Sequence, residues 1–226
     1  MKNKGFLSLI IVCLMIVTAA FAAHAEAPVG TPPDYYVESD GNITMRSELA
    51  QLCDIGIMSD VGGGAYASIT RSEMAKIVTQ LYGLPHIDEL CDFCDVSTRN
   101  KYAGSIKFVA DQKIMNGYGN GLFLPDKDIT YYEAVKTIVT VLGYEPLAIQ
   151  KGAYPHGYLK VATELGLIYF PAMEDRIASK NDISDILFKA IDTPLMKQNG
   201  FGSNVSYVIM DGKNGTPLET LRIIRD

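Results

Sequence analysis

The chain has 226 residues, of which 48% are hydrophobic and 20% charged, and its formal net charge is −6 at pH 7. This acidic balance argues against a broad nucleic-acid surface, which needs a basic face, but it allows an anionic ligand held by one or two local cations. The length suits one domain or a compact array of repeats.

Residues 1–25 predict a secretory signal peptide. Lys2 and Lys4 precede an apolar run over residues 6–21, and Ala23-His24-Ala25 supplies small residues for cleavage. A membrane anchor is the alternative, although the run is shorter than the ~20 apolar residues of a spanning helix. We therefore expect a secreted chain without a membrane span, beginning with a linker over residues 26–42.

One helical pattern is written more than once. The stretches "ITRSEMAKIVTQLYG" from Ile69 and "ITYYEAVKTIVTVLG" from Ile129 share their opening, their Glu and their closing Gly. A weaker third copy, "IASKNDISDILFKAID", starts at Ile177. Residues at i, i+3, i+4 and i+7 form an apolar stripe in each copy, with Thr137 as the one polar member in the second, and this spacing predicts an amphipathic helix.

Another helix is expected before each of these. The three apolar stripes are Met45, Leu49, Leu52 and Cys53; then Tyr102, Ile106, Val109 and Ala110; then Tyr158, Val161, Ala162 and Leu165. The unit is thus helix, loop, helix, written three times. Because neither helix can bury its stripe alone, the units must pack on one another. Phe123, in the Gly-rich loop of the second unit, is expected in the core.

The start of each second helix carries a capping signal. Thr70 with Glu73, and Thr130 with Glu133, fit the capping box, and the third unit has a degraded version at Ser179. Arg71 has no such explanation, since a cation in the first turn opposes the helix dipole. A ligand-binding role is one reading, and a solvated surface Arg is the other.

The residual cysteines are Cys53, Cys91 and Cys94. Their odd number excludes a framework of disulfides alone. Cys91 and Cys94 form a C-x-x-C in a loop between helical patterns, where a local disulfide or two free thiols is favoured over a redox or metal site. A zinc site would need further ligands, and none follow at suitable spacing.

Together these features resemble the S-layer homology module. The resemblance rests on "FCDV" at Phe93, "GYGNGLFLP" at Gly117 and "ITRSE" at Ile69, and it covers roughly residues 45–192. It divides the chain into modules at 43–84, 85–145 and 146–193, the last divergent, followed by a β-rich tail or the start of a further segment at 194–226.

The resemblance implies an all-α fold in which three modules form a pseudo-threefold prism. Grooves between modules would bind an anionic, pyruvylated secondary polymer of the bacterial cell wall, without a cofactor or metal. It implies secretion to the cell envelope, non-covalent anchoring there, and surface-layer proteins as further partners. Carried over, the polymer-binding residues are Thr70, Arg71, Glu73, Thr130, Tyr131, Glu133, Ser179 and Lys180.

Simple chemistry agrees with this assignment. An Arg fork reads a carboxylate with two hydrogen bonds, and free N–H groups at a helix start favour an anion at the same place. Two positions depart from the pattern: Tyr131 replaces the Arg with an aromatic surface suited to a sugar face, and Lys180 is a point charge. Weak binding, or a degenerate module used for structural or protein–protein assembly, is therefore the alternative.

The segment "NVSYVIMDGKNGTPLETLRIIRD" predicts a hairpin of two short strands around Asp211-Gly212 and Asn214-Gly215. A lone hairpin is marginal in water, so it either pairs with the helical units or leads into a larger protein. Catalytic motifs are missing from the sequence, which disfavours an enzyme. "PDKDITYYE" has alternating acids but lacks the Gly and the span of a calcium loop.

Overall fold

The computed structural model describes residues 35–37, 43–45, 47–59, 64–84, 87, 89, 91–169, 174–200 and 204–225. The chain divides into two compact parts, Met1–Arg46 and Ser47–Asp226. In the N-terminal part, strand β1 (Tyr35–Val37) pairs antiparallel with β2 (Ile43–Met45). The predicted signal peptide lies outside the described residues.

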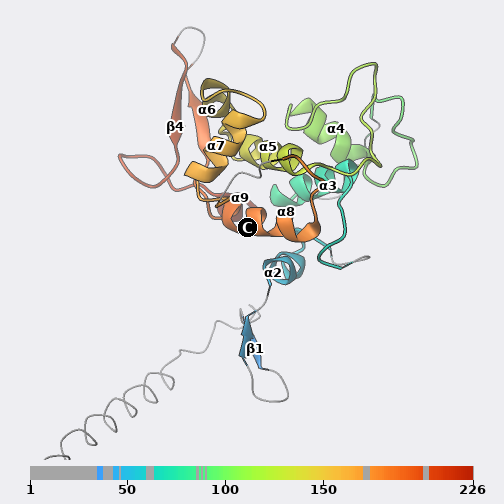
Figure 1. Ribbon diagram of the computed structural model, residues 1–226. Helices are drawn as coiled ribbons and strands as arrows, with labels where there is room; N and C mark the ends of the chain where they lie inside the picture. Colours follow the sequence, from blue (N-terminus) through green and yellow to red (C-terminus); the bar gives the residue numbers. More distant parts are fainter. Residues whose placement is uncertain are drawn as a thin grey trace, which may run out of the picture. The chain divides into compact units, whose positions relative to one another are not determined.

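The C-terminal part, which contains the three helix–loop–helix units, is mostly helical (Figure 1). Its elements are α2 (Glu48–Asp54), α3 (Arg71–Leu81), α4 (Ala103–Asp111), α5 (Tyr131–Val141), α6 (Glu145–Gln150), α7 (His156–Glu164), α8 (Lys180–Ala190), β3 (Met196–Asn199), β4 (Ser206–Ile209) and α9 (Leu221–Arg225). The predicted mostly helical fold with a short C-terminal hairpin is confirmed.

The first predicted helix was placed too early. Met45 ends strand β2, and α2 begins at Glu48. Ser47 caps it, because its side chain accepts a hydrogen bond from the N–H of Ala50 at 3.2 Å. The sequence reading extended the apolar stripe through this cap.

Helices α3, α5 and α8 have one design. Each has eleven residues and begins with a complete capping box. The third box was expected to be degraded, and that expectation is wrong: Ser179 accepts from the N–H of Asp182 at 3.1 Å, and Asp182 accepts from the N–H of Ser179 at 2.9 Å. An Asp therefore closes the box as Glu does in the other two.

Each unit buries its apolar stripes against the helices of neighbouring units. Helix α4 packs on α3 of the preceding unit, α7 packs on α5, and α2 returns to pack on α8. Met74, Ile106 and Ile138 are completely buried at these contacts, and Phe123 is too, as predicted. Each first helix thus covers the second helix of the unit before it, and the order closes on itself.

Short main-chain bridges repeat the same cyclic order. Thr70 pairs with Asp128, Thr130 with Ile177, and Ser68 with Ser179. The segment before each second helix therefore touches the corresponding segments of both other units. This gives every pair of units a direct contact at the helix starts. The prism geometry that the family resemblance implies stays a prediction.

The C-terminal hairpin exists, but at a different place from the one expected. Strand β4 pairs antiparallel with β3, from Met196 opposite Ile209 to Asn199 opposite Ser206. The stretch after Asp211 was expected to supply the second strand. It instead makes one bridge, between Asp211 and Leu218, and then forms α9.

This tail docks on the helical units. The N–H of Met196 donates to the carbonyl of Leu142 at 2.9 Å, just beyond the end of α5. Arg222 pairs with Asp192, with Nε 2.6 Å from Oδ1. Of the two alternatives for the tail, pairing with the helical units is therefore observed.

Candidate functional site

The exposed N–H groups at the helix starts already have partners. At α3, the N–H of Arg71 donates to the carbonyl of Lys127 at 2.9 Å, and that of Ser72 to the carbonyl of Pro125 at 3.0 Å. The first N–H of α5 and of α8 donates in the same way, Tyr131 to the carbonyl of Arg176 and Lys180 to the carbonyl of Ala67. The expectation that free N–H groups here receive an anion is wrong, because main-chain carbonyls of a neighbouring unit's loop already accept their hydrogen bonds.

Arg71 reaches from α3 into the loop of the second unit. Its Nε donates to the carbonyl of Phe123 and its Nη2 to the carbonyl of Asn116, both at 2.9 Å. The guanidinium also lies between two rings, 4.7 Å from the centroid of Tyr118 and 4.6 Å from that of Phe123. The residue is only 4% exposed, and this burial lowers its pKa below the ordinary value. The alternative of a solvated surface Arg is therefore wrong.

Glu133 is the centre of a small charged network. Oε2 accepts from the N–H of Thr130 at 3.1 Å, which completes the capping box. Oε1 accepts from the hydroxyl of Tyr118 and lies 3.7 Å from Lys127 Nζ and 3.9 Å from Arg71 Nη1. Burial raises the pKa of this carboxyl, but these hydrogen bonds and cations together outweigh it, so the net pKa is lowered.

A cleft of about 280 Å³ opens beside this network. Arg71, Tyr118, Glu133, Lys136 and Tyr154 line it, over an apolar floor that includes Ile114 and Met115. We call it the Arg71 cleft. The rings of Tyr118 and Tyr154 are almost half exposed, at 46% and 47%, and can therefore meet a ligand face.

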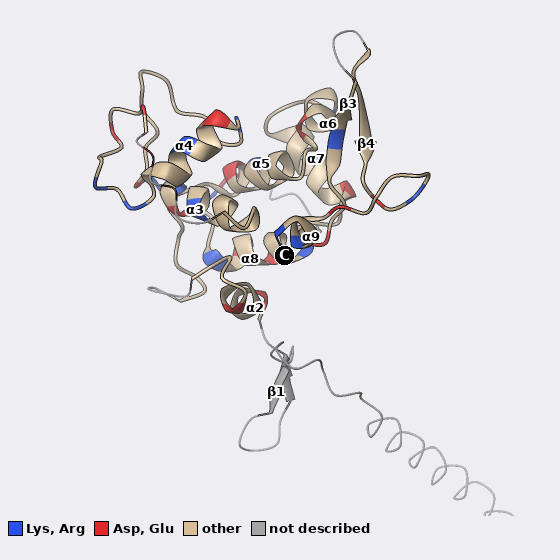
Figure 2. Ribbon diagram, turned by 180° about the vertical axis from the view of Figure 1, so that it is seen from behind, with Lys and Arg blue, Asp and Glu red and all other residues tan. Residues whose placement is uncertain are grey.

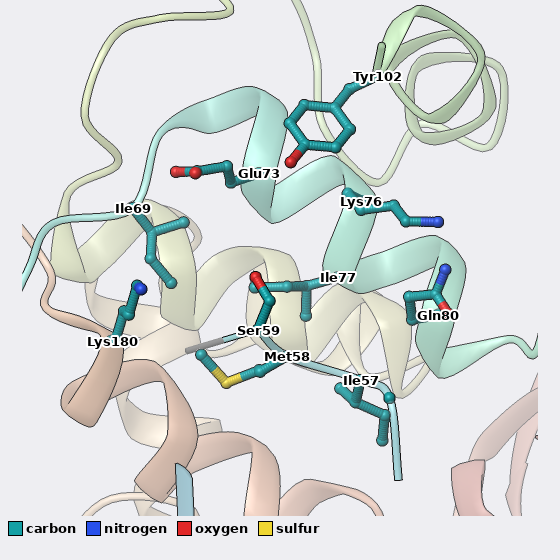
Figure 3. A pocket seen from close by; sticks show the side chains of 11 residues that line it. Ile57, Met58, Ser59, Ile69, Glu73, Lys76, Ile77, Gln80, Tyr102 and Lys180 are labelled. Carbon is teal, nitrogen blue, oxygen red and sulfur yellow. The ribbon is translucent and has the colours of Figure 1, made fainter. Parts of the chain in front are cut away.

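A second cleft, of about 330 Å³, is lined by the equivalent residues where the third unit meets the first. We call it the Lys180 cleft; its lining includes Met58, Glu73, Lys76, Tyr102 and Lys180. Figure 3 shows Lys180 at the start of α8, Tyr102 at the start of α4, and Glu73 and Lys76 on α3. Both clefts are lined by the first residue of one unit's second helix together with two residues of the next unit, its capping acid and the Lys three positions later.

The third helix start differs. Tyr131 occupies the place of Arg71 and Lys180, but it is only 9% exposed, so the expected aromatic surface for a sugar is wrong. Arg176 lies over its ring at 5.1 Å and forms a fork with Asp182, with N–O distances of 2.7 and 2.6 Å. The hydrogen bonds from Arg176 are the main reason that the pKa of Asp182 falls to about 2. This cation is thus already neutralised.

Several cleft residues were missed by the sequence analysis. Tyr118, Lys136 and Tyr154 were not assigned, although Lys76 and Lys136 occupy matching places in the two repeated stretches. Asp95, in the "FCDV" stretch, accepts from the N–H groups of Phe123 and Leu124 at 2.9 and 2.7 Å. It thereby fixes the loop that carries the carbonyl bound by Arg71.

The remaining features bear on thiol, metal and membrane chemistry. Cys91 and Cys94, the pair in the C-x-x-C, are free thiols. Within the described ranges, His, Cys, Asp and Glu side chains form no group of three that could hold a metal ion. No helix in the described part combines the length and apolarity that a membrane span requires. Figure 2 shows basic and acidic residues interspersed along the coloured chain, so any anion site must be local.

Comparisons with known proteins relate part of the chain to a known domain. The model of the S-layer homology domain matches residues 92–135, which contain α4, the Gly-rich loop and the start of α5. The chain is similar to the "Middle cell wall protein" of Brevibacillus brevis, with 31% identity over 87% of the chain and 18% of that protein.

Two further relatives agree. The "Surface layer protein" of Brevibacillus choshinensis is 26% identical over 92% of the chain, and the "Cell surface protein" of Thermoanaerobacter kivui is 27% identical over 87%. The chain spans only 18% and 26% of their lengths. Residues 92–135 thus match the S-layer homology domain, and the relatives' names point to a protein of the bacterial cell envelope.

Proposed function

We propose that the protein is held non-covalently at the cell wall, because its Arg71 and Lys180 clefts bind an anionic, pyruvylated secondary polymer. One observation carries the proposal: two clefts of like construction each join a cation from one unit to a Glu, a Lys and a Tyr from its neighbours. A pair of equivalent sites on one molecule suits a polymer with a repeating acidic group.

The chemistry of the clefts supports an acidic sugar as the ligand. Arg71, Lys136 and Lys127 concentrate positive charge around one carboxylate, Glu133, within a chain that is acidic overall. The aromatic faces of Tyr118 and Tyr154 suit the apolar face of a pyranose ring. Two weak sites on one chain gain strongly from multivalency when the polymer repeats.

Roles follow for the residues assigned from the sequence. Thr70, Thr130 and Ser179 fix the helix starts by capping, and Arg71 and Lys180 face the anion. Glu73 and Glu133 shape the two clefts. Tyr131 contributes through Arg176 and Asp182 to a third position whose charge is already balanced. The proposal contains no catalytic step.

The test uses a methyl hexopyranoside that carries a pyruvate ketal, titrated calorimetrically against the purified chain. We expect binding that disappears when the ketal is absent. Lys136→Ala should weaken it by about fivefold or more, because a cation leaves a partly desolvated cleft. Lys160→Ala removes an exposed Lys elsewhere and serves as the matched control. Equal affinity for the ketal-free sugar would refute the proposal.

An assembly module at the cell surface is the second candidate. It is favoured by the hydrogen bonds of Arg71, since two of its nitrogens bind main-chain carbonyls and so hold two units together without a ligand. In that case the chain would bind surface-layer protein but not the ketal sugar. Pull-down with each partner separately distinguishes the two functions.

A further inference from the structure

The two oxygens of Glu133 have separate tasks. Oε2 completes the helix cap through Thr130, as in every capping box. Oε1 faces the Arg71 cleft, where the hydroxyl of Tyr118 donates to it and two cations lie within 4 Å. An acidic oxygen surrounded by a hydroxyl, an ammonium and a guanidinium has the environment that a bound ligand carboxylate would require.

Arg71 has one nitrogen left for such a ligand. Nε and Nη2 bind main-chain carbonyls at 2.9 Å, whereas Nη1 lies 3.9 Å from Glu133 Oε1, beyond hydrogen-bond distance. Nη1 makes no hydrogen bond to any residue that the structure describes. A nearly buried guanidinium therefore keeps a donor in the cleft, and Glu133 screens its charge without bonding to it.

Tyr118 completes the screen. Its ring covers the guanidinium of Arg71 at 4.7 Å and lies 4.5 Å from the ammonium of Lys127, whose Nζ is 2.5 Å from the Tyr118 hydroxyl. The ring is attached to a Gly-rich loop and is almost half exposed. The Tyr118 hydroxyl is thus bonded to both Glu133 and Lys127 while its ring lies over Arg71.

The equivalent acid in the other cleft lacks this arrangement. Glu73 Oε2 accepts from the N–H and hydroxyl of Thr70, at 2.8 and 3.1 Å. Among the described residues, no Lys or Arg forms a salt bridge with it. The capping role alone therefore does not require the cations that surround Glu133, and those cations belong to the cleft.

We propose that Glu133 is an internal competitor for the Arg71 cleft: its Oε1 occupies the carboxylate position and holds Tyr118 over Arg71, and a ligand carboxylate must displace both. This inference rests on the proposed function and deepens it. Two carboxylates cannot share the position without strong repulsion. The cleft consequently selects ligands that bring a full negative charge together with ring contacts, and it holds each of them weakly.

The experiment titrates the same pyruvate-ketal hexopyranoside against three variants. Glu133→Gln keeps the capping box, because Gln also serves at that position, and removes the competing charge. We expect it to bind about tenfold more tightly than the wild type, the order of effect of one like charge in a partly desolvated site. Tyr118→Phe keeps the ring but frees it, so it should also bind more tightly, by a smaller factor.

Glu219→Gln makes the same change of charge in the C-terminal tail and should leave the affinity unchanged. Thermal melting of each variant establishes that it is folded. If Glu133→Gln does not fold, the affinity of Tyr118→Phe alone tests the inference. If the wild type binds and neither variant binds more tightly, the inference is overturned while the proposed function stands. If neither the wild type nor the variants bind, both are wrong.

Discussion

Arg71 combines two roles that its sequence position does not separate. Its fork was expected to face solvent and an anion, yet two of its nitrogens bind the carbonyls of Phe123 and Asn116 in the next unit. Arg71 therefore serves mainly to link two units, and only its third nitrogen faces the cleft. Substitutions at this residue must be read for stability before they are read for binding.

We predict that Arg71→Met destabilises the protein by about 2–4 kcal/mol, because one buried and one part-buried carbonyl lose a charged donor. Urea unfolding followed by circular dichroism measures the change. Arg176→Met is the matched control: its side chain is 53% exposed, so its loss should cost less than about 1 kcal/mol. Equal effects would show that Arg71 is not a structural bond.

The Arg176–Asp182 pair predicts a specific response to acid. The pKa of Asp182 is about 2 in the folded chain, below its ordinary 3.8, because Arg176 stabilises the charged form. A lowered carboxyl pKa contributes stability above the unfolded value, and this is lost as the pH falls from about 4 to 2. Wild type should therefore lose more stability over this range than Arg176→Met. Parallel curves for the two proteins would contradict the pairing.

At this scale the sequence predicted some residues and not others. Capping residues could be recognised because their partners lie three positions away. The partners of Arg71 lie 45 and 52 positions away, so local electrostatics suggested an anion where main-chain carbonyls lie. Tyr118 and Tyr154 became cleft residues only through the exchange of helices between units.

At the scale of single elements, the three capped helices were the most predictable feature. Their periodicity and the first two capping boxes are local features, and the structure contains both. Helices α6 and α9 were missed because six and five residues are too few for a periodic pattern. The hairpin was misplaced because turn dipeptides after Met210 indicated turns correctly but not their strand partners.

The three caps should contribute alike if the repeat is structural. Thr70→Ala, Thr130→Ala and Ser179→Ala are each expected to cost about 1 kcal/mol, since each leaves a first-turn N–H without its acceptor. Chemical unfolding of the three variants measures this. A negligible loss for Ser179→Ala would show that the third box is not equivalent to the others.

Gly143 should be essential for docking the tail. Its φ is +85°, and an added Cβ would lie 2.0 Å from the carbonyl oxygen of Met196. Gly166 has a similar φ of +72° but open space around it. Gly143→Ala should therefore destabilise well beyond the roughly 1 kcal/mol of backbone strain expected for Gly166→Ala. Similar losses in urea unfolding would mean that the tail shifts easily.

At the scale of the molecule, the units form a closed order rather than an open array. Helix α2 of the first unit packs on α8 of the third, and Ser68 bridges to Ser179. The sequence showed the repeats but not this closure, because contacts between the first and last units have no local signal. Each cleft depends on residues from more than one unit, so binding and closure are linked.

Closure predicts that the third unit cannot be removed. A chain ending at residue 145 lacks α7 and α8, so it exposes the face of α5 that α7 covers and the face of α2 that α8 covers. An open array would instead lose only its last repeat. We expect broad thermal unfolding and a poorly dispersed NMR spectrum for the truncated chain. A sharp transition with dispersed signals would instead indicate independent units.

Retention by an acidic wall polymer is tested most directly by co-sedimentation of the purified chain with cell-wall sacculi. We predict that the protein sediments with intact sacculi and stays in solution with sacculi stripped of secondary polymer. The Lys136→Ala variant should stay in solution with intact sacculi, whereas the Lys160→Ala variant should sediment. Equal sedimentation with intact and stripped sacculi would contradict it.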